Sequence, residues 1–199
     1  MNITCPQSMV PHVQQVLDGE YNIQYEGTPT ITDLGANVGS FAVWASMKWP
    51  GCTIHCYEPS KSNFELLSKN ISQISNSTVI CRNEAVGDKS LTRLYKGKNN
   101  IGECSLYKIG EQSDEFEDII TVAPETIPET TILKLDVEGA EGYILSKLKD
   151  FNKLTYSIIL LEYHGEDNRR QVDRILEGYS LVGGKIYRVG RGVLKYMKI

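Results

Sequence analysis

The residues best suited to catalysis lie in the run Lys134-Leu135-Asp136-Val137-Glu138-Gly139-Ala140-Glu141, which largely alternates charged and apolar side chains. On a β-strand alternate residues share a face, so Lys134, Asp136 and Glu138 should project together. Glu141 should rejoin Glu138 if a helix follows, because residues three apart are neighbours on a helix. Charged groups are costly to bury unless they are paired or used. The run therefore predicts either catalytic groups, namely Lys134, Asp136 and Glu138, or an ion-pair network that fastens the strand.

These carboxylates also allow two kinds of chemistry. Either Lys134 and nearby groups neutralise them and Asp136 acts as a base, or Asp136, Glu138 and Glu141 bind a hard divalent cation such as Mg²⁺ through oxygen. We favour the first, because Lys134 on the same strand face would repel a metal ion. The site is therefore predicted to be free of metal.

A second candidate base lies farther along the chain. Glu162-Tyr163-His164 ends the apolar run of residues 157–161 and should reach the same edge of a sheet. An imidazole can exchange a proton near neutral pH, so His164 is a candidate catalytic residue. A lone histidine is more often structural, and that alternative remains open.

A glycine-containing run, Asp33-Leu34-Gly35-Ala36-Asn37-Val38-Gly39-Ser40, predicts a ligand-binding turn. Glycine lets the backbone turn tightly, and the amides of a helix N-terminus point into the same space. Gly35 and Gly39 lie four residues apart, so this is not the dinucleotide pattern G-x-G-x-x-G. The spacing leaves room for a nucleoside with an amino-acid tail, and Asp33 supplies an acceptor for an ammonium group. The predicted contacts are Asp33, Gly35, Asn37, Gly39 and Ser40; alternatively, the glycines serve only a sharp turn.

Acidic residues at the ends of the next two strands complete the nucleoside site. Glu58, in Tyr57-Glu58-Pro59, falls 19 residues after Gly39, about where an acid would bind ribose hydroxyls. A carboxylate can accept hydrogen bonds from both hydroxyls at once. Asn83-Glu84-Ala85 follows the third strand, where adenine would lie. Glu58, Pro59, Glu84 and Ala85 are the predicted contacts here.

The elements that must position these residues alternate between strand and helix. Strands are expected at 30–34, 53–57, 78–82, 131–136 and 157–161. Helices are expected at 38–49, from 59 onward, at 140–148, and along the face of Val172, Ile175, Leu176 and Tyr179. This βαβαβ pattern predicts a mostly parallel sheet with right-handed crossovers. Residues 185–189 and 193–199 should close the chain as an antiparallel β-hairpin.

The whole chain, 1–199, is predicted to be one α/β domain. Residues 1–29 form an N-terminal extension. Residues 84–130 are a β-rich insertion, with short strands expected at 91–96, 103–108 and 117–122.

Composition excludes several classes of protein. A net charge of −4 argues against a general nucleic-acid binder. A basic group near the C-terminus is better explained as the solvated face of a hairpin; it comprises Lys185, Arg188, Arg191, Lys195 and Lys198. No run approaches the ~20 apolar residues of a membrane helix, and the N-terminus does not resemble a secretory signal. Five scattered cysteines suit reduced thiols, so a cytoplasmic location is expected.

Taken together, the motifs resemble the FkbM family of methyltransferases that use S-adenosylmethionine (SAM). The resemblance covers roughly residues 30–165, and the run from Asp136 to Glu141 is its most particular part. It implies a Rossmann-like class I methyltransferase fold with SAM as methyl donor. It also implies transfer to a hydroxyl oxygen of a sugar, polyketide or other small molecule. The matching motifs are residues 33–39, 57–59, 85–88, 135–141 and 161–164.

In the expected reaction, the glycine turn and Glu58 hold SAM, and Asp136 orients the acceptor hydroxyl and takes its proton, with Glu138 or His164 assisting. The chain is compact, with little material to cover the cleft, so a partner subunit could complete the site in a homo-oligomer. Two rival functions remain: an RNA or protein methyltransferase on the same fold, and a non-catalytic domain that binds SAM or a partner.

Overall fold

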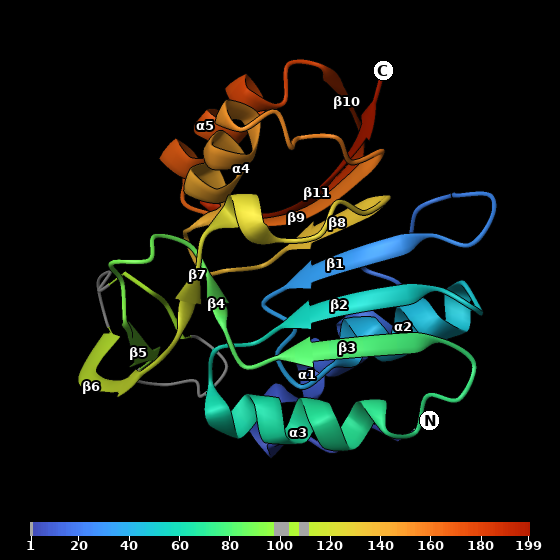
Figure 1. Cartoon of the computed structure of the whole chain (residues 1–199), viewed down its shortest axis with the longest axis vertical. Helices are drawn as coiled ribbons and strands as arrows, with labels where there is room; N and C mark the ends of the chain where they lie inside the picture. Colours follow the sequence, from blue (N-terminus) through green and yellow to red (C-terminus); the bar gives the residue numbers. More distant parts are fainter. Residues whose placement is uncertain (1, 98–103, 108–111) are drawn as a thin grey trace.

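The core of the computed structural model is a seven-stranded sheet with the order β10-β11-β9-β8-β1-β2-β3 (Figure 1). The structure describes residues 2–97, 104–107 and 112–199. Strands β3, β2, β1, β8 and β9 run parallel, whereas β11 is antiparallel to both of its neighbours. The bounds are β1 (Thr30–Leu34), β2 (Thr53–Tyr57), β3 (Thr78–Arg82), β8 (Ile132–Leu135), β9 (Ile158–His164), β10 (Tyr179–Arg188) and β11 (Arg191–Lys198). The predicted parallel sheet and closing hairpin are confirmed.

Helices cover both faces of this sheet because its central strands are apolar on both sides. Ile132 of β8 packs in the hydrophobic cluster that contains the α2 residues, and Leu133 packs in the cluster that contains the α4 and α5 residues. Successive residues pack on opposite faces of the sheet because side chains on a strand alternate with a period of two residues. The helices are α1 (Val10–Leu17), α2 (Ser40–Lys48), α3 (Lys61–Ile71), α4 (Glu141–Asp150) and α5 (Glu166–Ile175), with 3₁₀ turns η1 (Gln7–Met9) and η2 (Pro124–Thr126).

Two predicted boundaries need correction. The helix expected from residue 38 begins at Ser40, because Asn37 (φ 50°) and Gly39 (φ 86°) have left-handed backbones that a helix cannot include. Tyr179, expected on a helix face, is the first residue of β10. Helix α5 ends at Ile175, and Gly178, a poor helix former, lies between the two elements.

Short strands occupy the segment between β3 and β8. Strand β4 (Ala85–Val86) pairs in parallel with β7 (Thr121–Val122), and β5 (Arg93–Gly97) pairs antiparallel with β6 (Gln112–Asp118). The strand expected at 103–108 lies partly outside the described residues; Ser105 makes a single bridge to Tyr95. Figure 1 shows this segment on the side toward which the carboxyl ends of β1, β2 and β3 point.

A buried side chain of α3 holds the start of the chain beside the glycine turn. Asn70 of α3 is fully buried; its amide donates to the carbonyl oxygens of Thr4 (2.9 Å) and Val38 (2.8 Å). Its Oδ1 accepts the Thr4 backbone N–H at 2.8 Å. These bonds hold the N-terminal segment beside the glycine turn.

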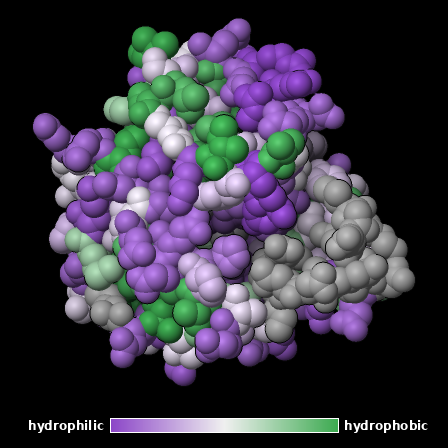
Figure 2. Space-filling view, turned by 180° about the vertical axis from the view of Figure 1, so that it is seen from behind, coloured by the Kyte–Doolittle hydropathy of each residue, from purple (hydrophilic) through white to green (hydrophobic). Residues whose placement is uncertain are grey.

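The rear of the molecule is mainly hydrophilic, with separate hydrophobic patches (Figure 2). Exposed apolar side chains of the closing hairpin include Ile186 (71% exposed) and Val189 (90% exposed). Within the described part of the chain, every helix falls short of the length and apolar character needed to cross a membrane.

Candidate active site

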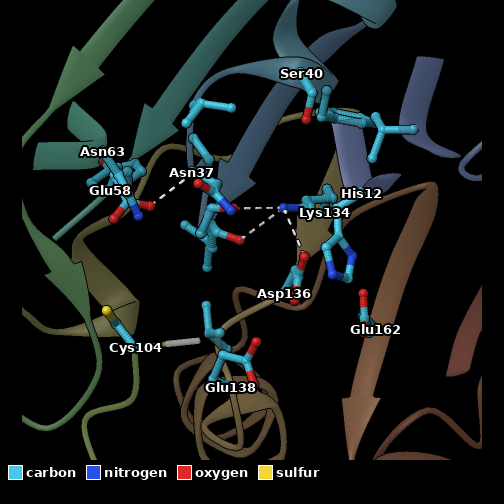
Figure 3. A pocket seen from close by; sticks show the side chains of 18 of the residues that line it. His12, Asn37, Ser40, Glu58, Asn63, Cys104, Lys134, Asp136, Glu138 and Glu162 are labelled. Carbon is cyan, nitrogen blue, oxygen red and sulfur yellow. Dashed lines mark hydrogen bonds and ion pairs between the residues drawn. The ribbon is translucent and has the colours of Figure 1, made fainter. Parts of the chain in front are cut away.

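A cavity of about 490 Å³ lies at the carboxyl ends of β1, β2, β8 and β9 (Figure 3). This is the edge where ligands of open α/β sheets bind. Most of the predicted site residues line it: Gly35, Asn37, Ser40, Glu58, Pro59, Glu84, Ala85, Lys134, Asp136 and Glu138. Three predicted residues, Asp33, Gly39 and His164, are not part of its lining.

Gly35 sits where β1 meets β8, with no room for a side chain. Its φ is 75°, and a Cβ atom there would lie 1.9 Å from the backbone oxygen of Asp136. The N–H groups of Gly35 and Ala36 both donate to the Tyr57 carbonyl oxygen at 3.0 Å. The turn thus joins the ends of β1, β2 and β8 on one side of the cavity.

Gly39 has a structural role in place of the predicted ligand contact. It precedes the first residue of α2 with φ 86°, and a Cβ there would lie 2.8 Å from Leu67 Cδ1 of α3. Glycine therefore lets α2 begin close against α3, behind the cavity wall.

Glu58 is a buried carboxylate held by two backbone amides. Its Oε2 accepts the Asn37 N–H at 2.8 Å, and its Oε1 accepts the Ser60 N–H at 2.9 Å. Burial raises the pKa of Glu58 to about 7, although these two hydrogen bonds favour the charged form. Each oxygen keeps a further lone pair for a ligand hydroxyl. Asn37 Oδ1 is also buried and has no hydrogen-bond partner among the described residues, which leaves it available to a ligand donor.

Asp33 faces Lys134 instead of the cavity. The two residues are register partners on β1 and β8, and Lys134 Nζ lies 3.1 Å from Asp33 Oδ1. The ammonium near Asp33 therefore belongs to the protein, which corrects the predicted contact with a ligand. Lys134 Nζ also donates to the Gly35 carbonyl oxygen at 2.8 Å and lies 3.7 Å from Asp136 Oδ2. Burial opposes the lysine charge, but Asp33 and Asp136 outweigh it and raise the pKa of Lys134, so this residue is a fixed cation.

His164 is held between two carboxylates. Its Nδ1 lies 2.8 Å from Glu141 Oε1, and its Nε2 lies 3.1 Å from Glu138 Oε2. Burial disfavours the imidazolium, but the hydrogen bond to Glu141 and the charges of Glu141 and Glu138 outweigh it and raise the pKa of His164 to about 9. A histidine that is protonated at neutral pH and lies outside the cavity lining is not the predicted base, because its carboxylate neighbours stabilise its charge.

Arg191, assigned from sequence to a solvated hairpin face, faces the acidic residues. Its Nε lies 2.6 Å from Glu162 Oε1, and its Nη2 lies 3.2 Å from Glu138 Oε1. Lys195 of the same basic group is also engaged, since its Nζ donates to the Asn22 carbonyl oxygen at 2.8 Å. The hairpin therefore brings positive charge to the sheet edge.

The acidic residues form an ion-pair network around these cations. Atoms of Asp136, Glu138 and His164 lie within 4.8 Å of one another, a spacing that a metal ion could bridge. Lys134 and Arg191 already supply positive charge to this edge, and a further cation would be repelled by both. We therefore assign no metal to this group.

Much of the cavity wall carries no recognisable sequence signal. The N-terminal segment, for which no ligand contacts are predicted, provides Met9, His12, Val13, Gln15, Val16, Glu20 and Tyr21. The segment after β4 provides Leu94, Cys104 and Leu106, and the hairpin provides Tyr187, Arg188 and Arg191. Tyr187 donates its hydroxyl hydrogen to Glu20, which joins the hairpin to the N-terminal segment. The cleft is thus covered by this chain itself, more than its compact sequence suggests.

Comparisons with known proteins agree on one family and one fold. The model of the methyltransferase FkbM domain matches residues 33–181. The 31-O-demethyl-FK506 methyltransferase FkbM of Streptomyces tacrolimicus is 22% identical over 195 residues, which cover 80% of this chain and 75% of that protein. Magnesium protoporphyrin IX methyltransferase (ChlM) from Synechocystis PCC 6803, solved with bound SAM, superposes with a TM-score of 0.56 at 11% identity, covering 96% of this chain and 80% of that one. Methyltransferase FkbM from Methylobacillus flagellatus KT superposes with a TM-score of 0.55 at 14% identity, covering 88% of this chain and 44% of that one.

Proposed function

The chain belongs to the FkbM methyltransferase family, and we propose that it transfers the methyl group of SAM to a hydroxyl oxygen of a small-molecule acceptor. The observation that carries this proposal is the cavity. It joins a nucleoside-type contact set, Glu58 with the glycine turn, to a carboxylate-rich edge at Asp136.

The residues on the first side of the cavity fit SAM. Glu58 offers carboxylate lone pairs for the two ribose hydroxyls, and the orphaned Asn37 Oδ1 offers a further acceptor. Apolar side chains beside Glu84 suit the faces of adenine: Ala85, Val86, Leu94 and Leu106. When bound, SAM supplies an activated methyl group on a sulfonium that is a good leaving group.

The protein's own contribution is orientation and charge. Lys134 neutralises Asp33 and Asp136 and holds the ends of β1 and β8 together. Asp136, whose side chain is 27% exposed, can accept a hydrogen bond from the acceptor hydroxyl and aim its oxygen. Alignment of the reacting atoms supplies much of the acceleration in such transfers.

The acceptor proposed here is neutral or weakly charged, with a hydroxyl group. Among the described residues, six carboxylates line the cavity, namely Glu20, Glu58, Glu84, Asp136, Glu138 and Glu162. They outnumber the three basic residues of the lining, Lys134, Arg188 and Arg191, and Lys134 and Arg191 are already paired with carboxylates. This balance disfavours polyanions such as RNA. Assembly into a homo-oligomer and a cytoplasmic location are part of the same proposal; the five free cysteines support the second.

A methyl-transfer screen tests the proposed function. Labelled SAM is incubated with pools of glycosides, polyketides, lipids and RNA, and the label is followed into each pool. We expect transfer to an alkali-stable ether in a glycoside or polyketide pool. Label in RNA, or SAM binding with no transfer to any pool, would favour one of the rival functions.

Asp136→Asn should separate catalysis from cofactor binding. The substitution preserves size but removes the charge that holds the acceptor hydroxyl, so turnover should fall at least about tenfold while SAM affinity stays within a few-fold. Calorimetry with SAM and initial rates with the acceptor identified by the screen measure the two effects. Equal losses of both would place Asp136 in the cofactor site, and an unfolded variant would mean that Asp136 serves the ion-pair network.

A further inference from the structure

Glu162 lies beside Asp136 at the reacting end of the cavity. Strands β8 and β9 are parallel with Leu135 opposite Leu161, and Asp136 and Glu162 are the residues that follow this last register pair. Both residues line the cavity, and Figure 3 shows them at the same end, with His12 close by in this view. Two carboxylates therefore face one space at this end of the cavity.

The surroundings of these two carboxylates differ. Asp136 is neutralised by Lys134, whose Nζ lies 3.7 Å from its Oδ2. Glu162 is anchored through one oxygen only: Oε1 lies 2.6 Å from Arg191 Nε and 3.7 Å from His164 Nε2. Within the described part of the chain no hydrogen bond reaches its Oε2, since the bond from Arg191 ends on Oε1. The anchor sets the side chain's orientation and leaves Oε2 available to a ligand.

The surroundings of Glu162 also affect its protonation. Burial and the charge of Asp136 raise the pKa of Glu162 to about 7, against the opposing effect of Arg191 and His164. The charged or titratable groups near it in the described part of the chain include Asp136, which follows β8, Lys134 of β8, His164 of β9, Arg191 of β11, and Tyr21 and His12 of the N-terminal segment. A new positive charge nearby would favour the ionised form.

We propose that Glu162 is a catalytic base that faces the sulfonium of bound SAM and takes the proton of the acceptor hydroxyl. The inference rests on the proposed function and names the proton acceptor within it. As the acceptor oxygen bonds to the methyl carbon, the methyl–sulfur bond breaks and its electron pair stays on sulfur. The hydroxyl proton passes to Glu162 Oε2. Asp136 orients the hydroxyl, and the positive charge of bound SAM would favour the ionised form of Glu162.

The test compares SAM with S-adenosylhomocysteine, which lacks the methyl group and the positive charge. Binding of each is measured by calorimetry near pH 7 in buffers of different ionisation enthalpy, which counts the protons released. At pH 7 about half of the Glu162 carboxylates carry a proton, so SAM should release up to about half a proton more than S-adenosylhomocysteine. The ribose is common to both ligands, so any proton lost from Glu58 cancels in the difference.

Glu162→Gln should abolish the difference between the two ligands. Glu177→Gln, at an exposed carboxylate paired with Lys149, is the matched control and should leave the difference intact. Equal proton release by the two ligands in the wild-type protein would overturn the proposal without any variant, as would a difference that survives Glu162→Gln. Failure of both ligands to bind would overturn the proposed function and this inference together.

Discussion

Gly35→Ala should remove measurable SAM binding. The added Cβ would lie 1.9 Å from the Asp136 backbone oxygen, so the ends of β1 and β8 would have to separate. That movement would displace Lys134 and the turn that leads to Asn37. The substitution also places an alanine at φ 75°, where the left-handed backbone alone costs roughly 1–2 kcal/mol. A melting-temperature measurement with and without SAM should show destabilisation and no stabilisation by the ligand.

Substitutions at two other glycines distinguish backbone strain from the steric clash as the cause of the loss in Gly35→Ala. Gly27 also has a positive φ (98°), but a Cβ there would meet nothing within 4 Å, so Gly27→Ala reports backbone strain alone. Gly178→Ala has open space and no positive φ, and should be nearly neutral. Both controls should retain the full stabilisation by SAM. The proposed contact is contradicted if SAM stabilises Gly35→Ala as well as the wild type.

Glu58→Ala should weaken SAM binding about ten- to a hundredfold. The substitution removes charge-assisted hydrogen bonds to the ribose that contribute about 1.5–3 kcal/mol each. It also leaves the Asn37 and Ser60 amides without their shared acceptor. Titration calorimetry with SAM measures the loss, and Glu65→Ala on the exposed face of α3 is the control. Unchanged affinity in a folded Glu58→Ala protein would exclude Glu58 from the site.

The raised pKa of Glu58 predicts how SAM affinity varies with pH. Because the pKa of Glu58 is raised to about 7, its carboxylate gains a proton as the pH falls through this value. The protonated group is a weaker acceptor, so SAM affinity should decrease from pH 8 to pH 6. Glu58→Gln should be weaker at both values and should lose the part of this dependence that comes from Glu58. A wild-type affinity that rises toward pH 6 would contradict the assignment.

The sequence alone determines the order of elements and predicts the place of the proposed cofactor site, because both depend on local patterns. Apolar periodicity and glycine positions act over a few residues, so β1, β2, β3 and β9 begin as predicted or within one residue. Glu58, Gly35 and Asn37 reach one cavity because they follow neighbouring parallel strands. The family assignment also follows from short motifs, and the match over residues 33–181 confirms it.

The partners of the charged side chains were decided only by the tertiary structure. Whether Asp33 meets a ligand or Lys134 depends on the register of β1 against β8, which brings together residues far apart in the sequence. The sequence makes His164 a candidate base, but in the fold Nδ1 is hydrogen-bonded to Glu141 and Nε2 lies within ion-pair distance of Glu138.

Several residues of the cavity wall likewise could not be predicted from the sequence. Arg191 lies between Glu162 and Glu138 because β11 inserts between β9 and β10, an order that hairpin patterning does not specify. His12 and Glu20 line the cavity because Asn70 and Tyr187 tie the N-terminal segment across it. Spacing along the chain reports which residues share a strand or helix. Which charges neutralise one another depends on distances that exist only after the sheet has formed.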